Sequence, residues 1–498
     1  MVQVIQTWTK KVISNITIEP VLIFFLFGYG VIFAGLKNFE LEKACATKST
    51  NDLKVCGIFP ELEGSDVCKK LFAENSTQPS PMAEGVNYTA EEIEHYRMVC
   101  AAKDEAVVNL TVLDSYRNVI TGLIEVVILL FAGSWSDRVG LRKPCILIPI
   151  AADTISLLAL IICAIFMREI PLEVTGILHQ LISALGGGGH LILTGVFSYL
   201  TIVTTESQRT FRFACASIVI SVIPIIARFF SGHIFKALGF LKLCILCTTT
   251  HSIALLYGIF VLKEPDSDAK NKTVANQNEP NSSSPTKKLF DMTLATDCIN
   301  VITKKRAFNI RKILMFTFVV YFINFGAAAD TNIAFSIAQS KFHWVTNLGI
   351  WGAYDALTTQ LGTMLAIGVL GKRFGVSDYF ICAFSVCFTL IAKPIMAYAV
   401  STLKDHFFYV ATSIDIFDGS KTVAIRSIVS KLVEQNEIGK INSLLGVIAS
   451  AQSIVYPTIY SVVFLQSRDI FIGAVFMLAE VFLLVSLGLY IVSSCPGS

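Results

Sequence analysis

Charged residues are scarce in this chain of 498 residues. Asp, Glu, Lys and Arg make up only 15%, whereas hydrophobic residues make up 54% and the mean hydropathy is +0.64. A soluble domain carries about 25% charged residues, so this composition excludes an ordinary soluble protein and predicts one embedded in a bilayer. The net charge of +3 is too small, and the basic residues are too dispersed, for a nucleic-acid-binding surface.

Several chemical motifs are also missing from the sequence. It contains no Walker loop, no nucleophile elbow, no dinucleotide-binding loop and no cluster with metal-ligand spacing. We therefore expect no enzymatic activity, no cofactor and no bound metal.

Long apolar runs fill most of the chain. A helix needs about 20 apolar residues to cross a bilayer, and about twelve such runs are present. The expected spans are 19–36, 112–132, 144–167, 172–203, 212–234, 239–262, 312–338, 346–370, 378–400, 405–425, 441–465 and 470–493. The connections on one side, among them 10–11, 304–306 and 372–373, are basic. Because positive loops stay in the cytoplasm, both termini are predicted to be cytoplasmic.

The polar segment 37–111 falls on the opposite side. It holds four cysteines, Cys45, Cys56, Cys68 and Cys100, and glycosylation sequons at Asn75, Asn87 and Asn109. This combination indicates an oxidising compartment and two disulfides, for which three pairings are open. A metal site is the weaker alternative because no CxxC or HxxxH spacing occurs in this segment.

A short polar turn joins the second and third expected spans. Its notable residues are Gly133, Asp137, Arg138, Gly140 and Arg142. The glycines allow backbones to pass closely, and the aspartate can pair with Arg or accept from helix N-terminal amides. A second copy of the pattern, from Gly368 to Gly375, lies in the other half, so the chain is predicted to be internally duplicated.

This turn resembles the loop signature of the major facilitator superfamily. The resemblance implies an all-α membrane protein with twelve transmembrane helices in two six-helix bundles, joined as a major facilitator fold. We expect an N-terminal bundle over 1–262, whose segment 37–111 is an extracellular, disulfide-bonded and glycosylated loop. A cytoplasmic linker with an interfacial helix would follow over 263–310, and a C-terminal bundle over 311–498.

Ionisable residues inside the expected spans are the candidate functional residues. An unpaired Arg in hydrocarbon costs at least ~2.5 kcal/mol, so such residues must face a partner or water. The candidates for the substrate and proton pathway are Arg228, Asp330, Lys393, Asp415, Asp418, Arg426 and His190. Basic members would attract an anionic group and the aspartates would take up a proton. The alternative is that these charges are structural pairs between helices, and for His190 a helix-packing hydrogen bond.

Other stretches are similar to the proton-coupled folate transporter family, solute carrier family 46. They are Gln208–Arg212 and the run from Ala424 to Val433, followed by Gly439–Lys440. The resemblance places that family's tenth-span arginine, which is implicated in proton and substrate binding, on Arg426.

Three positions depart from the folate carrier's pattern. Ser217 stands where that carrier has a glutamate needed for proton coupling, Asn324 stands where it has a histidine, and Gly188 where it has an aspartate. The resemblance therefore implies a relative that carries another organic solute.

These observations together predict a secondary active transporter. It would move a small, anionic organic solute through the bilayer by alternating access, with protons as the expected coupling ion. The alternative is a non-transporting membrane receptor or scaffold on the same fold, with which the cysteine-rich segment and the linker are compatible. The linker lacks tyrosine and acidic dileucine sorting signals, which favours the plasma membrane over the lysosomal membrane.

Overall fold

The computed structural model describes residues 17–48, 53–63, 68, 89–139, 141–204, 206–264, 310–433 and 438–494. All elements in these ranges are helices. Those before residue 264 are α2 (Glu19–Lys48), α3 (Leu53–Gly57), η1 (Phe59–Leu62), α5 (Ala90–Val139), α6 (Pro144–Ile165), α7 (Leu172–Leu185), α8 (Gly188–Val203) and α9 (Glu206–Val261). Those after residue 310 are α12 (Ile310–Ala328), α13 (Asp330–Lys341), α14 (Thr346–Leu365), η2 (Ala366–Arg373), α15 (Asp378–Thr402), α16 (His406–Ile414), η3 (Asp415–Phe417), α17 (Asp418–Lys431), α18 (Ile438–Ser467) and α19 (Ala474–Ser494).

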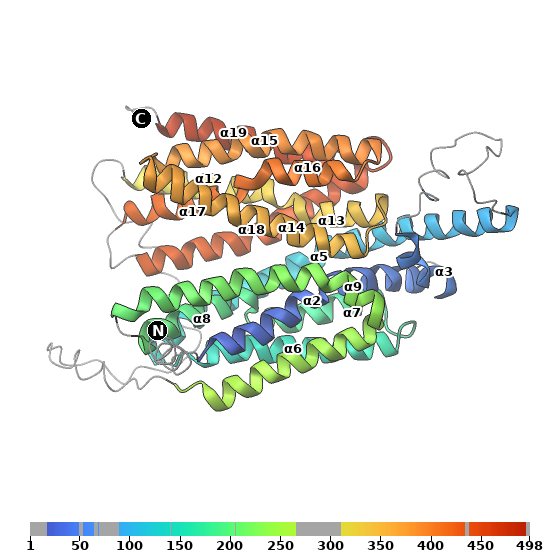
Figure 1. Cartoon of the computed structure of the whole chain (residues 1–498), viewed down its shortest axis with the longest axis horizontal. Helices are drawn as coiled ribbons and strands as arrows, with labels where there is room; N and C mark the ends of the chain where they lie inside the picture. The colour runs from blue at the N-terminus through green and yellow to red at the C-terminus, as the bar shows by residue number, and fades with distance from the viewer. Residues whose placement is uncertain are drawn as a thin grey trace, which may run out of the picture.

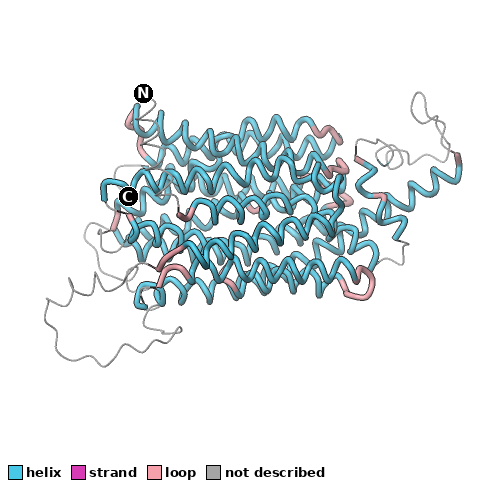
Figure 2. Tube along the Cα trace, turned by 60° about the horizontal axis from the view of Figure 1, so that its bottom comes forward, coloured by secondary structure: helices cyan, strands magenta, loops and turns pink. Residues whose placement is uncertain are grey.

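The helices lie in two groups side by side (Figure 1). The blue-to-green helices α2 and α5–α9 form one group, and the yellow-to-red helices α12–α19 form the other; Figure 2 shows the same parallel arrangement from another side. At one end of the molecule lie the disulfides Cys45–Cys56 and Cys68–Cys100, which we call the disulfide end. At the opposite end, the linker end, α9 finishes and α12 begins. The all-α architecture of two helical bundles is confirmed.

The twelve expected spans correspond to these helices, but several are broken. In α9 the backbone is non-helical at Gly239 (φ 73°), where the chain turns back, so α9 covers the fifth and sixth spans. The fourth span breaks between α7 and α8 at Gly187, whose φ of 90° favours glycine. The tenth span, expected as one helix, consists of α16 and α17 joined by the 3₁₀ turn η3.

The hydropathy of α14, α16 and α17 is lower than that of most other expected spans. Eight described helical stretches are long and apolar enough to cross a membrane, and one of these, Arg212–Val261, contains the turn at Gly239. The helix α14 and the pair α16 and α17 are not among the eight. Their apolar runs are interrupted by polar residues, and these residues line the cavity described below.

The segment 37–111 is more helical than the expected loop. α2 continues to Lys48 and α5 begins at Ala90, because apolar residues such as Leu41, Ala44 and Val99 bury one face of each helix in a shared cluster. The two disulfides join the ends of these helices to the short described pieces between them. Asn75 and Asn87 lie outside the described residues, and Asn109 is half-buried within α5.

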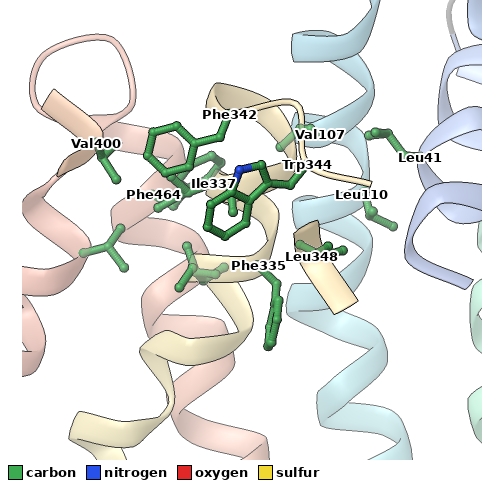
Figure 3. Close-up of a cluster of buried hydrophobic side chains, with 14 of the residues drawn as sticks. Leu41, Val107, Leu110, Phe335, Ile337, Phe342, Trp344, Leu348, Val400 and Phe464 are labelled. Atoms are coloured by element: carbon green, nitrogen blue, oxygen red, sulfur yellow. The ribbon is translucent and has the colours of Figure 1, made fainter. Parts of the chain in front are cut away.

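The largest apolar cluster joins the two groups of helices near the disulfide end. It contains Val107 and Leu110 of α5 together with Phe335 of α13 and Trp351 of α14, and Trp344 lies between α13 and α14 (Figure 3). Both tryptophans are only 1% exposed. Burying one large apolar side chain contributes about 1.5–3 kcal/mol, so this cluster stabilises the contact between the groups at that end.

Glycines allow α9 and α14 to cross closely in the same region. A Cβ on Gly232 would lie 2.5 Å from the Cα of Thr346, and a Cβ on Gly349 would lie 2.5 Å from the carbonyl oxygen of Arg228. A real Cβ does not approach other atoms so closely. The two groups of helices are therefore closed against each other at the disulfide end.

Gly362 of α14 has a different neighbour, the backbone of Ile416 in η3. A Cβ there would overlap the Ile416 carbonyl, so we expect Gly362→Ala to separate α14 from η3 and to destabilise the protein by about 1–3 kcal/mol. Gly368→Ala is the matched control, since nothing lies within 4 Å of its Cβ position. The melting temperature of the purified protein in detergent tests this. Equal melting temperatures for the two variants would contradict the packing described.

Candidate functional site

A small cavity lies inside the second group of helices, where several of the polar spans meet. Its volume is about 50 Å³, and it is lined by Ala328, Asp330, Thr331, Ala334, Trp351, Asp355, Thr359, Lys393, Met396, Asp415 and Asp418. A space of this size holds a few water molecules but no organic solute. Four carboxylates and a lysine in one enclosed space make it the best candidate for an ion- or proton-binding site.

Asp330 and Lys393 form a buried ion pair across this cavity. Asp330 begins α13, immediately after the break from α12, and Lys393 lies in the middle of α15. The Lys393 Nζ is 2.8 Å from the Asp330 Oδ2, and the side chains are 6% and 1% exposed. At this distance each residue neutralises the other, so Lys393 is held by protein rather than left to attract a substrate.

A second ion pair lies on the first turn of α17. Lys421 is paired with Asp418 one turn away, and the lysine side chain is only 3% exposed. This pair shares the cavity wall with Asp415, which begins η3. The Thr389 hydroxyl donates to Asp415 at 2.6 Å and lies 3.5 Å from Asp418. The break in the tenth span thus turns two aspartates toward the same threonine of α15.

Asp355 and Asp415 differ from the paired aspartates. Among the described residues, neither carboxylate has a basic group within ion-pair distance, although both lie on the cavity. Asp355 belongs to α14 and interacts electrostatically with Arg228 of α9, in the other group of helices. The guanidinium of Arg228 lies over the Phe33 ring at 5.1 Å.

Aromatic rings close the space between this site and the disulfide end. Phe33 of α2 meets Phe335 of α13 edge to face at 4.9 Å, and Phe335 meets Trp351 at 4.8 Å. The Trp351 indole N–H donates to the Thr412 hydroxyl at 3.0 Å. Since Phe33 and Phe335 belong to different groups of helices, this stack separates the charged cavity from the disulfide end.

Three sequence-predicted site residues lie elsewhere. Arg228, half-buried in α9, is not among the residues that line the cavity. Arg426, on α17, is exposed and is not among the residues that line the cavity. His190, on the first turn of α8, is exposed and interacts with Glu125 of α5. The structure therefore groups Asp330, Lys393, Asp415 and Asp418 in one place, and sets Arg426 and His190 apart from them.

The polar turn after α5 is only partly described. Gly133, Asp137 and Arg138 belong to the end of α5, where the backbone alone is described, and Gly140 lies outside the described residues. Arg142 and Lys143 precede α6, and their backbone amides both donate to the carboxylate of Glu264. Glu264 thus fixes the start of α6 beside the end of α9.

The sequence analysis missed a buried ion network in the first group of helices. Arg117 of α5 donates to Glu40 of α2 at 2.5 Å and 3.2 Å and pairs with Asp114 at 2.5 Å, and Lys37 lies 4.0 Å from Asp114. A Cβ on Gly176 of α7 would lie 2.9 Å from the Arg117 guanidinium. The usable signal was the i, i+3 spacing of Asp114 and Arg117 inside an apolar run.

Comparison with known proteins identifies the family. The Major Facilitator Superfamily model matches residues 118–457, which is more than half of the chain. The chain belongs to this superfamily. The proton-coupled folate transporter of Rattus norvegicus is 23% identical over 351 residues, covering 70% of this chain and 71% of that protein. The probable peptidoglycan muropeptide transporter SLC46 of Drosophila melanogaster is 21% identical over 470 residues, covering 91% and 80%.

Solved structures agree on the fold. A D-xylose-proton symporter superposes with a TM-score of 0.62 at 11% sequence identity, covering 96% of this chain and 97% of that one. Members of this superfamily move solutes through a central site between two bundles by opening it alternately to each side. This chain is a secondary active transporter and an integral, multi-pass membrane protein.

The Asp330–Lys393 pair predicts a specific pattern of stabilities. Asp330→Asn or Lys393→Met alone leaves one buried charge unpaired, and we expect each to destabilise the protein by about 3–5 kcal/mol. Asp330→Asn combined with Lys393→Met removes both charges and should recover most of that loss. Melting temperatures in detergent measure the effect. The matched control is Lys431→Met, which breaks the exposed Lys431–Asp378 pair and should cost at most about 1 kcal/mol. Single variants as stable as this control would show that the pair is not buried.

Proposed function

We propose that this transporter couples the uptake of a small organic anion to protons through Asp355, Asp415 and Arg228. The two ion pairs cancel their own charges, which leaves two carboxylates on the cavity. We count with them the guanidinium of Arg228, which lies outside the cavity lining but interacts electrostatically with Asp355. The site then carries one net negative charge and repels an anion. After both carboxylates take up protons it carries one net positive charge, centred on Arg228. Proton uptake and anion binding are thereby linked by charge alone.

The observation that carries this proposal is that one cavity contains both aspartates paired with lysine and aspartates without such a partner among the described residues. Asp330 and Asp418 are already neutralised by lysines, so Asp355 and Asp415 are the groups that a proton neutralises. This differs from the sequence-based expectation, in which Asp330, Asp415 and Asp418 were equivalent. Folates and muropeptides, which the names of similar proteins mention, both carry carboxylates, and this supports an anionic substrate.

We further propose an orientation and a conformation. The disulfide end faces the outside of the cell, both termini are cytoplasmic, and the plasma membrane is the site of action. The bundles comprise 1–262 and 311–498, with the linker 263–310 between them. Since the bundles are closed at the disulfide end, the described conformation faces the cytoplasm.

Uptake into proteoliposomes tests the proton sites. Labelled folates, cyclic dinucleotides and muropeptides should be offered at external pH 5.5 and 7.4. We expect one of these classes to accumulate roughly tenfold per pH unit of gradient for each coupled proton, because one unit supplies about 1.4 kcal/mol. Asp355→Asn with Asp415→Asn should abolish accumulation driven by the pH gradient. Asp469→Asn, at a side chain that is 81% exposed, is the control and should behave as wild type.

The outcomes separate the alternatives. Accumulation driven by the pH gradient that survives in the double variant would contradict the assignment of the protons. A compound that binds but never accumulates would identify a receptor on a transporter fold.

Substitution of Arg228 tests anion binding separately from proton binding. Losing a charged hydrogen-bond partner costs about 1.5–3 kcal/mol, so Arg228→Ala should raise the concentration for half-maximal uptake by roughly 10- to 100-fold. Arg228→Lys keeps the charge without the planar guanidinium and should fall between. The control is Arg468→Ala, an arginine paired with Asp469 at the disulfide end. If Arg228→Ala and Arg468→Ala transport equally well, Arg228 does not bind the substrate.

A further inference from the structure

The closed disulfide end contains a hydrogen bond between two nitrogen bases. The Nζ of Lys103 in α5 lies 3.1 Å from the Nδ1 of His343, which lies between α13 and α14. The two residues belong to different bundles, and they are 1% and 6% exposed. A hydrogen bond between two nitrogens requires one of them to accept, so this contact exists only while at least one nitrogen lacks its acidic proton.

His343 is also held in an unusual backbone conformation. Its φ is 54°, and among the described non-glycine residues only Leu403 shares a positive φ. Such a conformation is uncommon for a side chain of this size and persists where the surroundings impose it. The adjacent cross-bundle cluster, which includes Trp344 and Phe342, supplies those surroundings.

The charged groups around this pair are Asp104, Glu63, Lys341 and Arg468, and Asp104, Lys341 and Arg468 line a cavity together with His343. Asp104 interacts with Lys103 electrostatically, accepts from the Ser340 hydroxyl at 3.1 Å and lies 3.7 Å from Lys341. Glu63 of the disulfide-bonded segment also interacts with Lys103, and the Phe59 ring lies 5.8 Å from its Nζ.

Glu63 closes the same end in a way that does not respond to mild acid. It accepts from the backbone amides of Val345 at 2.8 Å and Asn347 at 2.9 Å, at the start of α14, and pairs with Lys236 of α9. Burial raises the pKa of this carboxyl, but the Lys236 ammonium and the two amides outweigh it and hold the pKa below its usual range. We call these contacts of Glu63 with Val345, Asn347 and Lys236 the Glu63 latch. The Glu63 latch is intact above the ordinary carboxyl pKa of about 4.3 and weakens only below it.

We infer that Lys103 and His343 form a proton-sensing contact that opens the disulfide end when the pH on that side falls. A second proton on the pair would place two cations 3.1 Å apart in a buried space, so closure excludes that proton. The open state exposes both groups to water, and in that state the pair can bind the second proton. Since the open state binds more protons, lower pH favours opening. The open-to-closed ratio therefore rises as the pH falls below the range in which solvent-exposed histidines titrate, about 6.5, and is independent of pH above it.

This inference rests on the alternating access of the proposed function, but its test needs no substrate. The probe is the distance between the bundles at the disulfide end. Ketone-bearing p-acetylphenylalanine is placed at Leu238 of α9 and at Ile470, between α18 and α19, which are 37% and 89% exposed. Dyes attached there report opening by single-molecule energy transfer in lipid nanodiscs, and the disulfides remain intact.

We expect low transfer efficiency to become more frequent in the wild type between pH 7.5 and 5.5, with an open-to-closed ratio that rises at most tenfold per pH unit for one linked proton. His343→Asn keeps an acceptor, suits a positive φ and cannot gain the second charge, so it should stay closed throughout. Lys103→Gln should weaken the response as well, because a protonated His343 then no longer lies 3.1 Å from an ammonium group.

Two controls define the result. His406→Asn changes an exposed histidine of α16 and should behave as wild type. Glu63→Gln should raise the open-to-closed ratio by the same factor at every pH, without changing how the ratio depends on pH. A wild type that never opens at pH 5.5, or a His343→Asn variant that opens with the wild-type midpoint, would overturn the inference. A failure of substrate uptake with this pH response intact would instead count against the proposed function.

Discussion

The pairing of buried charges in the second bundle determines what the site can do. Two lysines neutralise two aspartates, and the neighbouring Asp355 and Asp415 have no basic group within ion-pair distance among the described residues. Separating an ionised pair inside a protein has a large free-energy cost. Asp330–Lys393 and Asp418–Lys421 are therefore expected to stay paired. In the proposed function, the unpaired carboxylates are the groups whose charge changes during a cycle. In this proposal the two ion pairs stabilise the cavity, whereas Asp355 and Asp415 bind the protons.

The geometry of the bundles supplies the other requirement of alternating access. Close helix crossings at Gly232 and Gly349, the aromatic stack from Phe33 to Trp351, and the Glu63 latch all close the same end. Arg228 lies where the bundles meet and interacts electrostatically with Asp355 of the other bundle. In the function proposed above, movement of one bundle against the other changes the distance between Arg228 and the two unpaired carboxylates, which links opening to the charge state of the site.

Much of the architecture follows from the sequence because a bilayer leaves few alternatives. Apolar run length gives the spans, and the duplicated turn at Gly133 and Gly368 gives the two bundles. Helix breaks were harder to predict: nothing local to residues 405–425 shows that Asp415 starts a 3₁₀ turn, because the break is set by packing against α14 at Gly362. The extension of α2 and α5 beyond the membrane was also missed, since a polar composition concealed a helical apolar stripe.

The sequence identified residues of the candidate site, but it did not show which of them lie together or form ion pairs. Charge within an apolar run selected Asp330, Lys393, Asp415 and Asp418, because such residues must avoid lipid, and the structure brings these four together around one cavity. Which of them are paired depends on contacts between α13, α15 and α17 that one sequence cannot show. Arg426 followed from a family resemblance, and its exposed position away from the cavity is a property of the three-dimensional arrangement alone.

Proton movement during transport tests the central claim most directly. A pH indicator trapped inside proteoliposomes would record protons that enter when the transported anion is added outside, with no imposed pH gradient. The account predicts internal acidification with the wild type and none with Asp355→Asn combined with Asp415→Asn, even where that variant still binds the anion. Accumulation of the anion by the wild type without any proton entry would contradict it.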